Sequence, residues 1–573
     1  MENTAELASA RTLSVQGKES LRGYVKSGQP WVWLTAAAIS VCFIITVSLL
    51  CLMAVRGLPH FWPAKLLQAE YQRPGDQPVS LLAEVRESEE VSSARLKNAG
   101  YPVDTAQAFY TRVLFKVGNR DLNGADFQFM LDNWIVKRAY PDDAAVFERM
   151  EWGNFHGKVV ALKKNGVVAA SGEQVWDIYP KLQQTANELR DRIRRIEKKQ
   201  IGSVNYRMDR LRLEGKRLQM KAKTPENDPA DYQAIEVQQR ALDAEYQKYR
   251  AELEGLNNEM SSNALVLKAV DGQEVEMPLS KITRGYRPNH MGVFAKLGLY
   301  FEKLWEFVSE DPREANTEGG IFPAIFGTVM MVLLMSVFVT PFGILAALYL
   351  REYAKQGTVT QIIRIAVNNL AGVPSIVYGM FGLGFFVYFL GANIDRLFYP
   401  EMLPSPTFGT PGILWSSLTL AILTLPVVIV ATEEGLTRIP RSIREASLAL
   451  GATKAETLWR VVLPMASPAM MTGLILAIAR AAGEVAPLML VGVVKLAPSL
   501  PLDGNFPFVH LERKFMHLGF HIYDVGFQSP NVEAARPLVY ATSFLLVMVI
   551  ILLNIAAIRI RNQLRERYKA LEH

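Results

Sequence analysis

Six long apolar runs constrain the fold of this chain more than any other feature of its sequence. Each has the twenty or so residues that a helix needs to cross a bilayer core of roughly 30 Å. The first run is too long, starts too late and lacks the small-x-small motif of a cleavable signal peptide. We therefore expect a polytopic α-helical membrane protein with six transmembrane helices. The runs lie at 31–55, 321–350, 362–391, 411–432, 467–494 and 535–558.

Basic residues beside these runs predict how the chain is oriented. Lysines and arginines flank the first run on its N-terminal side, fill the second and fourth connections and follow the last run. Short cytoplasmic loops carry such an excess of positive charge. The pattern places residues 1–30 and the basic tail 559–573 in the cytoplasm, with 57–320 outside. The basic residues are Lys18, Arg22, Lys26, Arg351, Lys355, Arg364, Arg438, Arg441, Arg444, Lys454, Arg460, Arg559, Arg561, Arg565, Arg567 and Lys569.

The outside region 57–320 is expected to be an α+β domain. Both cysteines, Cys42 and Cys51, lie in the first predicted transmembrane helix, 31–56, so no disulfide framework can staple this domain. Short β-like runs cover 109–115, 159–162 and 264–269, with turn signals at Lys164-Asn165-Gly166, Thr224-Pro225-Glu226-Asn227-Asp228-Pro229 and Asp271-Gly272. The last run is expected to pair back with the earlier ones.

Between these strands, residues 174–261 predict an antiparallel coiled-coil hairpin. Apolar residues recur at heptad spacing along both halves, with a slip near Gln200. The basic run 190–199 fits the solvated face of such a hairpin better than a nucleic-acid or anionic-lipid site. The seam residues are Leu182, Leu189, Ile193, Ile196, Val204, Met208, Leu211, Leu218, Ile235, Leu242, Tyr246, Tyr249, Leu253, Leu256 and Met260.

A charged segment between the fourth and fifth runs indicates a contact with a separate protein that drives transport. It reads Arg444-Glu445-Ala446-Ser447-Leu448-Ala449-Leu450-Gly451, followed by Val461-Val462-Leu463-Pro464. The spacing resembles the EAA loop of ABC-importer permeases, with Ser447 and Val461 in place of the usual alanine and isoleucine. We expect a coupling loop over 433–464 whose two short helices meet at Gly451. The alternative is an amphipathic loop lying on the inner leaflet. The expected ATPase-coupling residues are Glu445, Ala446, Gly451, Leu463 and Pro464.

Two ionisable residues interrupt the fifth run. Arg480 and Glu484 are four residues apart, so a continuous helix would place both on one face near the middle of the membrane. Such residues cost roughly 2.5–3.5 kcal/mol each at mid-bilayer. They are either a mutually neutralising buried pair or an anion site on a translocation path. Neighbouring alanines and Gly483 leave room for the second interpretation, and Pro487 is expected to open the helix.

The Arg480 and Glu484 pair suits a protonated oxyanion. A guanidinium offers a planar fork of donors that matches phosphate-type oxygens. A neighbouring carboxylate repels sulfate, whereas hydrogen phosphate can donate its remaining proton to that carboxylate. The residue types therefore favour phosphate over sulfate as cargo.

Other features are weaker guides to function. Asn368-Asn369 either lines a polar path or bonds across helices, and Gly372-Val373-Pro374-Ser375 should break the third span. His156 is expected at a surface turn. No Walker-type phosphate loop, metal-ligand spacing or nucleophile elbow is visible. We therefore expect a transporter channel component that is not an enzyme, with no cofactor or metal, and with ATP bound by a partner.

Several stretches resemble the phosphate-specific ABC importer permeases of the PstA type. They are 316–320, AGVPSIVYG at 371–379, 444–451 and AIARAAGEVAP at 477–487. The resemblance covers 31–56 and about 316–565, and implies the type I ABC importer permease fold in a permease core over 321–558. It also implies a bacterial inner membrane location, a homologous second permease, a dimeric ABC ATPase, a periplasmic phosphate-binding protein and ATP-driven alternating access. Arg480 and Glu484 carry over as residues facing the phosphate path.

The insertion at 57–320 departs from that family. Its role is open among docking the binding protein, contacting an extension of the second permease, reaching the cell wall and adding stability. Two other functions remain open. One is a permease for another oxyanion, and the other is a membrane-anchored scaffold or phosphate-status sensor that works through the hairpin.

Overall fold

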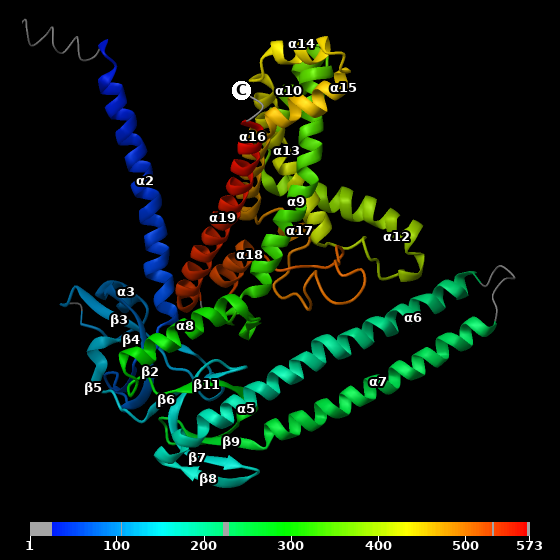
Figure 1. The fold of residues 1–573 in the computed structure, drawn as a ribbon. Coiled ribbons are helices and arrows are strands. Elements are labelled where there is room, and N and C mark those ends of the chain that lie inside the picture. The colour runs from blue at the N-terminus through cyan, green and yellow to red at the C-terminus, as the bar shows by residue number, and fades with distance from the viewer. Residues whose placement is uncertain (1–25, 105, 222–228, 530–531, 570–573) are drawn as a thin grey trace, which may run out of the picture.

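The structure is a computed structural model that describes residues 26–104, 106–221, 229–529 and 532–569. Figure 1 shows a bundle of long helices beside a β-sheet domain, with a long helical hairpin extending from that domain. Among the described residues, six helices are long and apolar enough to cross a membrane, as the sequence predicts. They span Pro30–Phe61, Phe322–Tyr353, Ser375–Phe398, Ile413–Thr437, Lys454–Gly483 and Ala535–Gln563.

Most of these spans are built from consecutive elements that continue one another. The elements are α2 (Gln29–Gly57) with η1 (Leu58–Phe61), α9 (Phe322–Leu348) with η7 (Tyr349–Tyr353), α11 (Ser375–Phe381) with η8 (Gly382–Gly391) and α12 (Ala392–Phe398), α13 (Ile413–Thr437), α15 (Lys454–Thr457) with η10 (Leu458–Val462) and α16 (Leu463–Gly483), and α19 (Val532–Lys569).

Two predicted spans lie at different residues in the structure. The run 362–391 is divided, because Pro374 has no N–H to donate and disfavours helical geometry in the residue before it. A separate helix, α10 (Thr358–Leu370), precedes the break, and the third span begins at Ser375. The fifth span covers 454–483 and not 467–494, so its helix starts within the charged segment and ends before Glu484.

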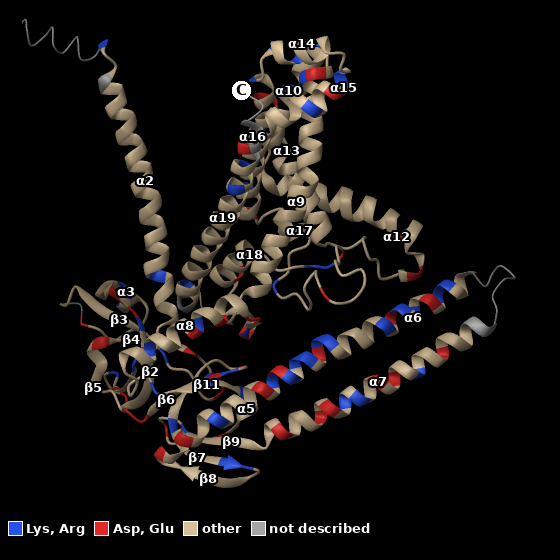
Figure 2. Ribbon diagram, in the orientation of Figure 1, with Lys and Arg blue, Asp and Glu red and all other residues tan. Residues whose placement is uncertain are grey.

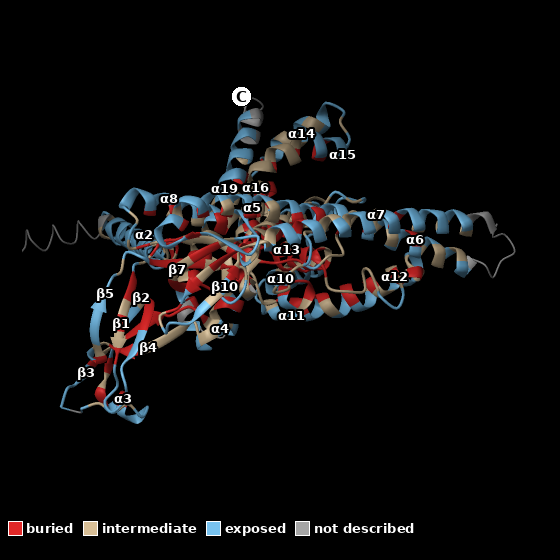
Figure 3. Ribbon diagram, turned by 90° about the horizontal axis from the view of Figure 1, so that it is seen from below, coloured by how far each residue is buried: buried red, intermediate tan, exposed pale blue. Residues whose placement is uncertain are grey.

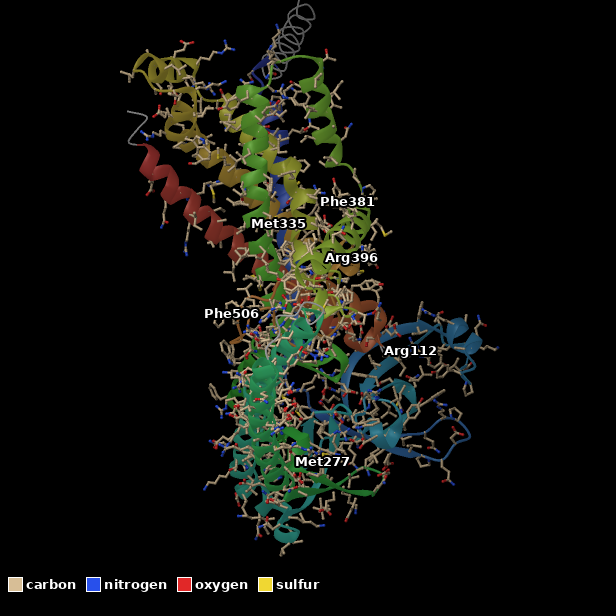
Figure 4. The ribbon with its side chains drawn as sticks, turned by 90° about the vertical axis from the view of Figure 1, so that its right-hand side faces the viewer. Arg112, Met277, Met335, Phe381, Arg396 and Phe506 are labelled. Atoms are coloured by element: carbon tan, nitrogen blue, oxygen red, sulfur yellow. The ribbon has the colours of Figure 1, made fainter. Side chains whose placement is uncertain are left out.

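The bundle is organised around α13. Two thirds of its apolar segment is buried, and it packs against α9 and α16. Their shared core includes Met331, Leu420 and Ala477, together with Met335, which Figure 4 labels. None of the corresponding segment of α2 is buried, and Figure 1 shows α2 diverging from the other spans. This first span therefore presents an apolar surface on all sides.

Two antiparallel sheets form the core of the region between α2 and α9. Their strand orders are β4-β3-β2-β1-β5 and β10-β9-β7-β6-β11, and β8 pairs with β7. Strand β9 pairs with β7, which makes the hairpin an insertion within one sheet, as predicted. Buried residues lie mainly on the central strands, such as β6, whereas the edge strand β5 is exposed, as Figure 3 shows. The strands are β1 (Leu66–Tyr71), β2 (Val79–Ser92), β3 (Phe109–Lys116), β4 (Phe127–Leu131), β5 (Ile135–Ala139), β6 (Ala144–Arg149), β7 (Phe155–Lys164), β8 (Val167–Ser171), β9 (Asn263–Lys268), β10 (Glu274–Pro278) and β11 (Ile282–Tyr286).

A long helical hairpin leaves this domain. Its first arm is α5 (Val175–Arg195), η4 (Ile196–Ile201) and α6 (Gly202–Lys221), and its second arm is α7 (Pro229–Ser261). The slip predicted near Gln200 is a π-helical turn, η4, which absorbs an extra residue. Seam residues such as Ile193 and Leu256 pack together across the arms. Figure 2 shows charges alternating along both arms. The turn predicted at 224–229 falls largely on residues 222–228, outside the described residues.

Short elements complete the described chain. They are α3 (Ser93–Asn98), α4 (Arg120–Asn123), η2 (Asp132–Trp134), η3 (Gly172–Gln174), η5 (Leu279–Lys281), α8 (Val293–Ser309), β12 (Pro312–Arg313), η6 (Glu314–Asn316), β13 (Glu318–Gly319), η9 (Pro400–Met402), α14 (Arg441–Ala449), α17 (Leu488–Val491), α18 (Leu518–Tyr523) and η11 (Asp524–Gln528). Of these, α8 joins the sheets to the second span, and α14 forms the tip of the bundle in Figure 1.

Candidate functional site

The charged segment forms the two short helices predicted from its motif, but the loop is shorter than the predicted 433–464, because α13 continues to Thr437 and the fifth span begins at Lys454. Helices α14 and α15 meet at Gly451, whose φ of 85° lies in the left-handed region that glycine adopts without strain. Thr453 begins α15 with a capping box, in which its hydroxyl accepts from the backbone of Glu456 and the Glu456 carboxylate accepts from the backbone of Thr453. The turn between the two helices is therefore specified by local sequence.

This segment is tied to the second and fourth spans through Arg444. Its guanidinium donates to the carbonyl oxygens of Leu436 (2.8 Å) and Ile439 (2.9 Å), at the end of α13. The same group pairs with the Glu352 carboxylate at 2.9 Å, at the end of η7. Lys454 donates to the backbone oxygen of Glu352 at 2.6 Å. The sequence did not identify Glu352 as part of this site, because no local pattern around it indicates that it pairs with Arg444, 92 residues away.

The predicted coupling residues divide between an exposed tip and the start of a span. Glu445, Ala446 and Gly451 are exposed, whereas Leu463 and Pro464 are half-buried at the start of α16. The hydroxyls of Ser447 and Thr457 lie 2.9 Å apart, which bridges α14 and α15. The serine that departs from the usual motif thus stiffens the turn. Leu450 is 89% exposed at the tip, which leaves a large apolar side chain without cover in this chain.

The structure changes the geometry expected for Arg480 and Glu484. Arg480 lies in the last turn of α16, and Glu484 is the residue after its end, with extended backbone geometry. The two residues therefore do not share a helix face, and neither lies at the middle of the span. They still form an ion pair, with 3.6 Å between Arg480 Nε and Glu484 Oε1. The side chains are 33% and 22% exposed, so neither is sealed in the core.

The small residues around this pair mostly fill the core and do not leave free space. Ala477, Ala481 and Ala482 are fully buried against the neighbouring spans. Gly483 is exposed, and a Cβ there would meet no neighbour. The room expected around Arg480 is thus confined to the side of Gly483.

Two of the motif stretches lie against each other at the end of α16. A Cβ at Gly379 would lie 2.7 Å from the Cα of Pro487, so only glycine allows this approach. The neighbouring Tyr378 hydroxyl donates to the Leu370 carbonyl at 2.6 Å, and its ring belongs to the same buried cluster as Ala477 and Ala481, which flank Arg480 on α16. The GVPSIVYG stretch of the third span therefore borders the Arg480 region.

A cavity of about 410 Å³ lies at the other end of the bundle, near α10 and the end of α13. Its walls include Arg364 and Glu433, which form an ion pair at 2.6 Å, and Asn368. Of the two interpretations of Asn368, the structure favours the polar lining. The remaining charged groups on the walls are Glu434 and Arg438.

The hairpin contacts two connections on the far side of the bundle from α14. Arg217 on α6 pairs with Glu401 in η9, with 2.7 Å between Arg217 Nε and the carboxylate. Glu401 is only 3% exposed. Tyr206 on α6 also donates to the carbonyl of Phe506, and the guanidinium of Arg210 lies 5.9 Å from the Phe506 ring. No local sequence signal predicts these contacts, which join residues 184 and 300 positions apart.

Burial alone would raise the pKa of Glu401, but hydrogen bonding and charge from Arg217 outweigh it and hold that pKa below its usual range. The carboxylate is therefore charged at neutral pH.

His156 is not at a surface turn. It lies in β7, is fully buried between the sheets and donates its backbone N–H to Asn119 at 2.7 Å. Burial lowers the pKa of its imidazole to about 4, so it is neutral at physiological pH. The nearby Asn154 suggested a surface turn, but His156 belongs to the strand that follows, and its side chain points inward. Across the described ranges, no group of three or more His, Cys, Asp or Glu residues is placed to hold a metal ion.

Comparison with known proteins matches the helical core. Residues 339–570 match the family model described as binding-protein-dependent transport system inner membrane component. The probable ABC transporter permease protein YqgI of Bacillus subtilis is 30% identical over 44% of this chain and 81% of that protein. The phosphate transport system permease proteins PstA 1 of Mycobacterium tuberculosis and PstA of Yersinia pestis are 34% and 32% identical. They align with 42% and 44% of this chain and with 71% and 75% of their own lengths.

Solved structures give a weaker likeness. An inward-facing MetNI methionine ABC transporter chain aligns with 42% of this chain and 94% of its own length, at 18% identity and a TM-score of 0.31. A bacterial alginate ABC transporter chain aligns with 43% of this chain and 78% of its own length, at 15% identity and a TM-score of 0.29. The family of this chain is therefore established by its sequence relatives.

Proposed function

This chain belongs to the PstA-type permeases of ABC importers, and from that premise we propose that it forms half of an inorganic phosphate path across a bacterial cytoplasmic membrane. The permease role rests on the family. The cargo rests on relatives that are named phosphate transport permeases and on the chemistry of Arg480 beside Glu484.

The Arg480 and Glu484 pair has the features that a transient phosphate contact needs. The pair is partly exposed, and its closest approach, 3.6 Å between Arg480 Nε and Glu484 Oε1, is longer than a hydrogen bond. A guanidinium that is held this loosely can turn to bind phosphate oxygens in a bidentate arrangement. Glu484 accepts the proton of hydrogen phosphate, which excludes an anion that carries no proton. The position at the end of α16, and not at mid-span, supports a role at the entrance of the path, on the extracytoplasmic side of our predicted topology.

The α14–α15 tip is our proposed contact for the ATPase. Glu445 and the exposed apolar Leu450 would enter a groove on a cytoplasmic ABC ATPase. Arg444 and Lys454 would transmit the movement of that groove to the second span through Glu352. Rocking of the spans would then expose the path alternately to the two sides of the membrane. The other partners we propose are a homologous second permease, a second ATPase copy and a periplasmic phosphate-binding protein.

The hairpin is proposed to lie in the periplasm, where α6 supports the connections that follow the third and fifth spans. Two contacts support the role of α6 at these connections, namely the Arg217–Glu401 pair and the hydrogen bond from Tyr206 to Phe506. Whether its two arms supercoil remains a prediction. The same contacts are the observation that favours the second candidate, a scaffold or phosphate-status sensor that acts through the hairpin.

Uptake of labelled phosphate at limiting concentration tests the proposal. Cells lacking this chain would receive the wild type, Arg480→Ala or the matched control Leu476→Ala, which changes an exposed residue one turn earlier on α16. We expect the wild type and the control to restore uptake and Arg480→Ala to fail at normal membrane levels. Excess sulfate should not compete. If phosphate uptake does not depend on this chain, phosphate is not its cargo, and the scaffold or sensor function becomes the better explanation. Replacing 174–261 by a short linker would then test that second function.

A further inference from the structure

Helix α8 exposes an apolar stripe. Phe294, Leu297, Phe301 and Trp305 follow one another at intervals of three or four residues, so they lie along one side of the helix. Their exposed fractions range from 37% to 90%. Gly298 lies within the same stripe and leaves it unobstructed. A helix on a water-exposed domain would turn such a stripe toward the core.

The charged side of α8 is the side that packs against the sheets. Lys303 pairs with Glu148 of β6, and Arg284 of β11 pairs with Glu306 at 3.0 Å and with Glu302 at 2.8 Å. These ion pairs fix the rotation of the helix about its own axis. The helix cannot bury its apolar stripe in its own domain without breaking them.

Helix α8 lies beside the ends of the first two spans, and this position indicates what covers its apolar stripe. Phe307 packs on Phe61 at the end of the first span, with ring centroids 4.9 Å apart, and both belong to a cluster with Ile321 and Ala324 at the start of the second span. Figure 1 shows α8 between the β-sheets and the ends of α2 and α19. Leu304 and Val308, which flank the stripe on the helix surface, pack against the same cluster. The exposed stripe therefore adjoins the apolar surface of the spans, at the level where the first span ends and the second begins.

We propose that α8 lies in the extracytoplasmic interface of the bilayer, with its aromatic stripe inserted among the lipid acyl chains. Phenylalanine and tryptophan are the residues that amphipathic interfacial helices bury in this zone, and tryptophan is enriched there in membrane proteins. The charged side then faces the sheets. The helix thus fastens the insertion domain to the membrane surface and sets its tilt relative to the spans. This inference depends on the membrane topology and not on the cargo.

Spin labels on single cysteines test the placement in the whole transporter reconstituted in phosphatidylethanolamine and phosphatidylglycerol vesicles. Cys42 and Cys51 would first be replaced by serine. Labels at Phe294→Cys, Phe301→Cys and Trp305→Cys report collision with oxygen, which concentrates in lipid, and with a water-soluble nickel chelate. Two reference sites are Ile39→Cys on α2 and Val237→Cys on α7, both exposed. Ala295→Cys, exposed beside Phe294 but about 100° round the helix, is the matched control.

The stripe labels should show an oxygen-to-nickel accessibility ratio several-fold above that of Ala295→Cys and close to that of Ile39→Cys. A ratio close to that of Val237→Cys would place the stripe in water and overturn the proposal. Low accessibility to both reagents would mean that a protein partner covers the stripe, which also overturns it. Reading three stripe positions protects the test against a single variant that misfolds, and size-exclusion chromatography of each purified variant before reconstitution checks its assembly independently of the cargo.

Discussion

Removal of the Arg444 side chain should separate ATP hydrolysis from transport. In the proposed cycle the α14–α15 tip receives a movement from the ATPase, and Arg444 is the link that passes it to the ends of α9 and α13. The perturbation is Arg444→Met, which keeps much of the side-chain volume and removes the guanidinium. Arg441→Met, on the exposed side of the same helix, is the matched control.

The size of the effect follows from what Arg444 contacts. Its side chain and that of Glu352 are only 18% and 13% exposed, and the guanidinium makes three hydrogen bonds of 2.8–2.9 Å. Losing one partner of a buried ion pair costs about 3–5 kcal/mol. Because the site lies at the edge of the protein and water can enter, we take the lower end, about 3 kcal/mol. That value lowers the equilibrium constant for seating the loop by roughly a hundredfold.

Two rates in reconstituted vesicles measure the outcome. Phosphate uptake by Arg444→Met should fall by more than about tenfold, while ATP hydrolysis continues and loses its stimulation by phosphate-loaded binding protein. Glu352→Gln should have a smaller effect, because Arg444 keeps its bonds to the carbonyl oxygens of Leu436 and Ile439. Wild-type uptake by Arg444→Met at normal membrane levels would refute the reasoning.

Three further predictions concern the cargo, the hairpin and the insertion domain. Arg480→Lys should reduce phosphate uptake less than Arg480→Ala but not restore it, because a lysine cannot bind bidentately; equal uptake by Arg480→Lys and wild type would show that charge alone suffices. Arg217→Ala should speed amide hydrogen exchange around 400–403 roughly tenfold, because it leaves the Glu401 carboxylate buried without its charged partner. Burying an unpaired polar group destabilises the loop conformation by about 1–3 kcal/mol. Unchanged exchange would mean that the hairpin does not hold this loop. Burial would raise the pKa of Glu148, but the charges of Lys303 and Arg284 lower it to about 2. The carboxylate therefore adds up to about 3 kcal/mol to the free energy of unfolding above pH 4.5, and this contribution is lost as the pH falls toward 2. Glu148→Gln should unfold more easily at neutral pH and show a flatter acid transition, and an unchanged thermal midpoint would contradict this.

Much of the candidate site was predictable because its signals are local. Gly451 needs only its own backbone freedom to make the α14–α15 turn, and the capping box at Thr453 is a pattern that spans a single helical turn. The interpretation of Glu484 failed because a four-residue spacing implies a shared face only while the helix continues. The helix ends at Gly483, shortly before Pro487, and the chain turns away.

Residue types alone were enough to predict the membrane character, the break at Pro374, the hairpin with its slip near Gln200 and the motif of the α14–α15 tip. Each of these depends on residues within a few turns of one another. The packing of the whole chain was needed to establish that Glu352 holds Arg444, that Arg217 reaches Glu401 and that α8 turns its charged side inward. These contacts join residues 92 and 184 positions apart in the first two cases. A local pattern cannot select such partners, because the packing of whole elements determines which distant side chains meet.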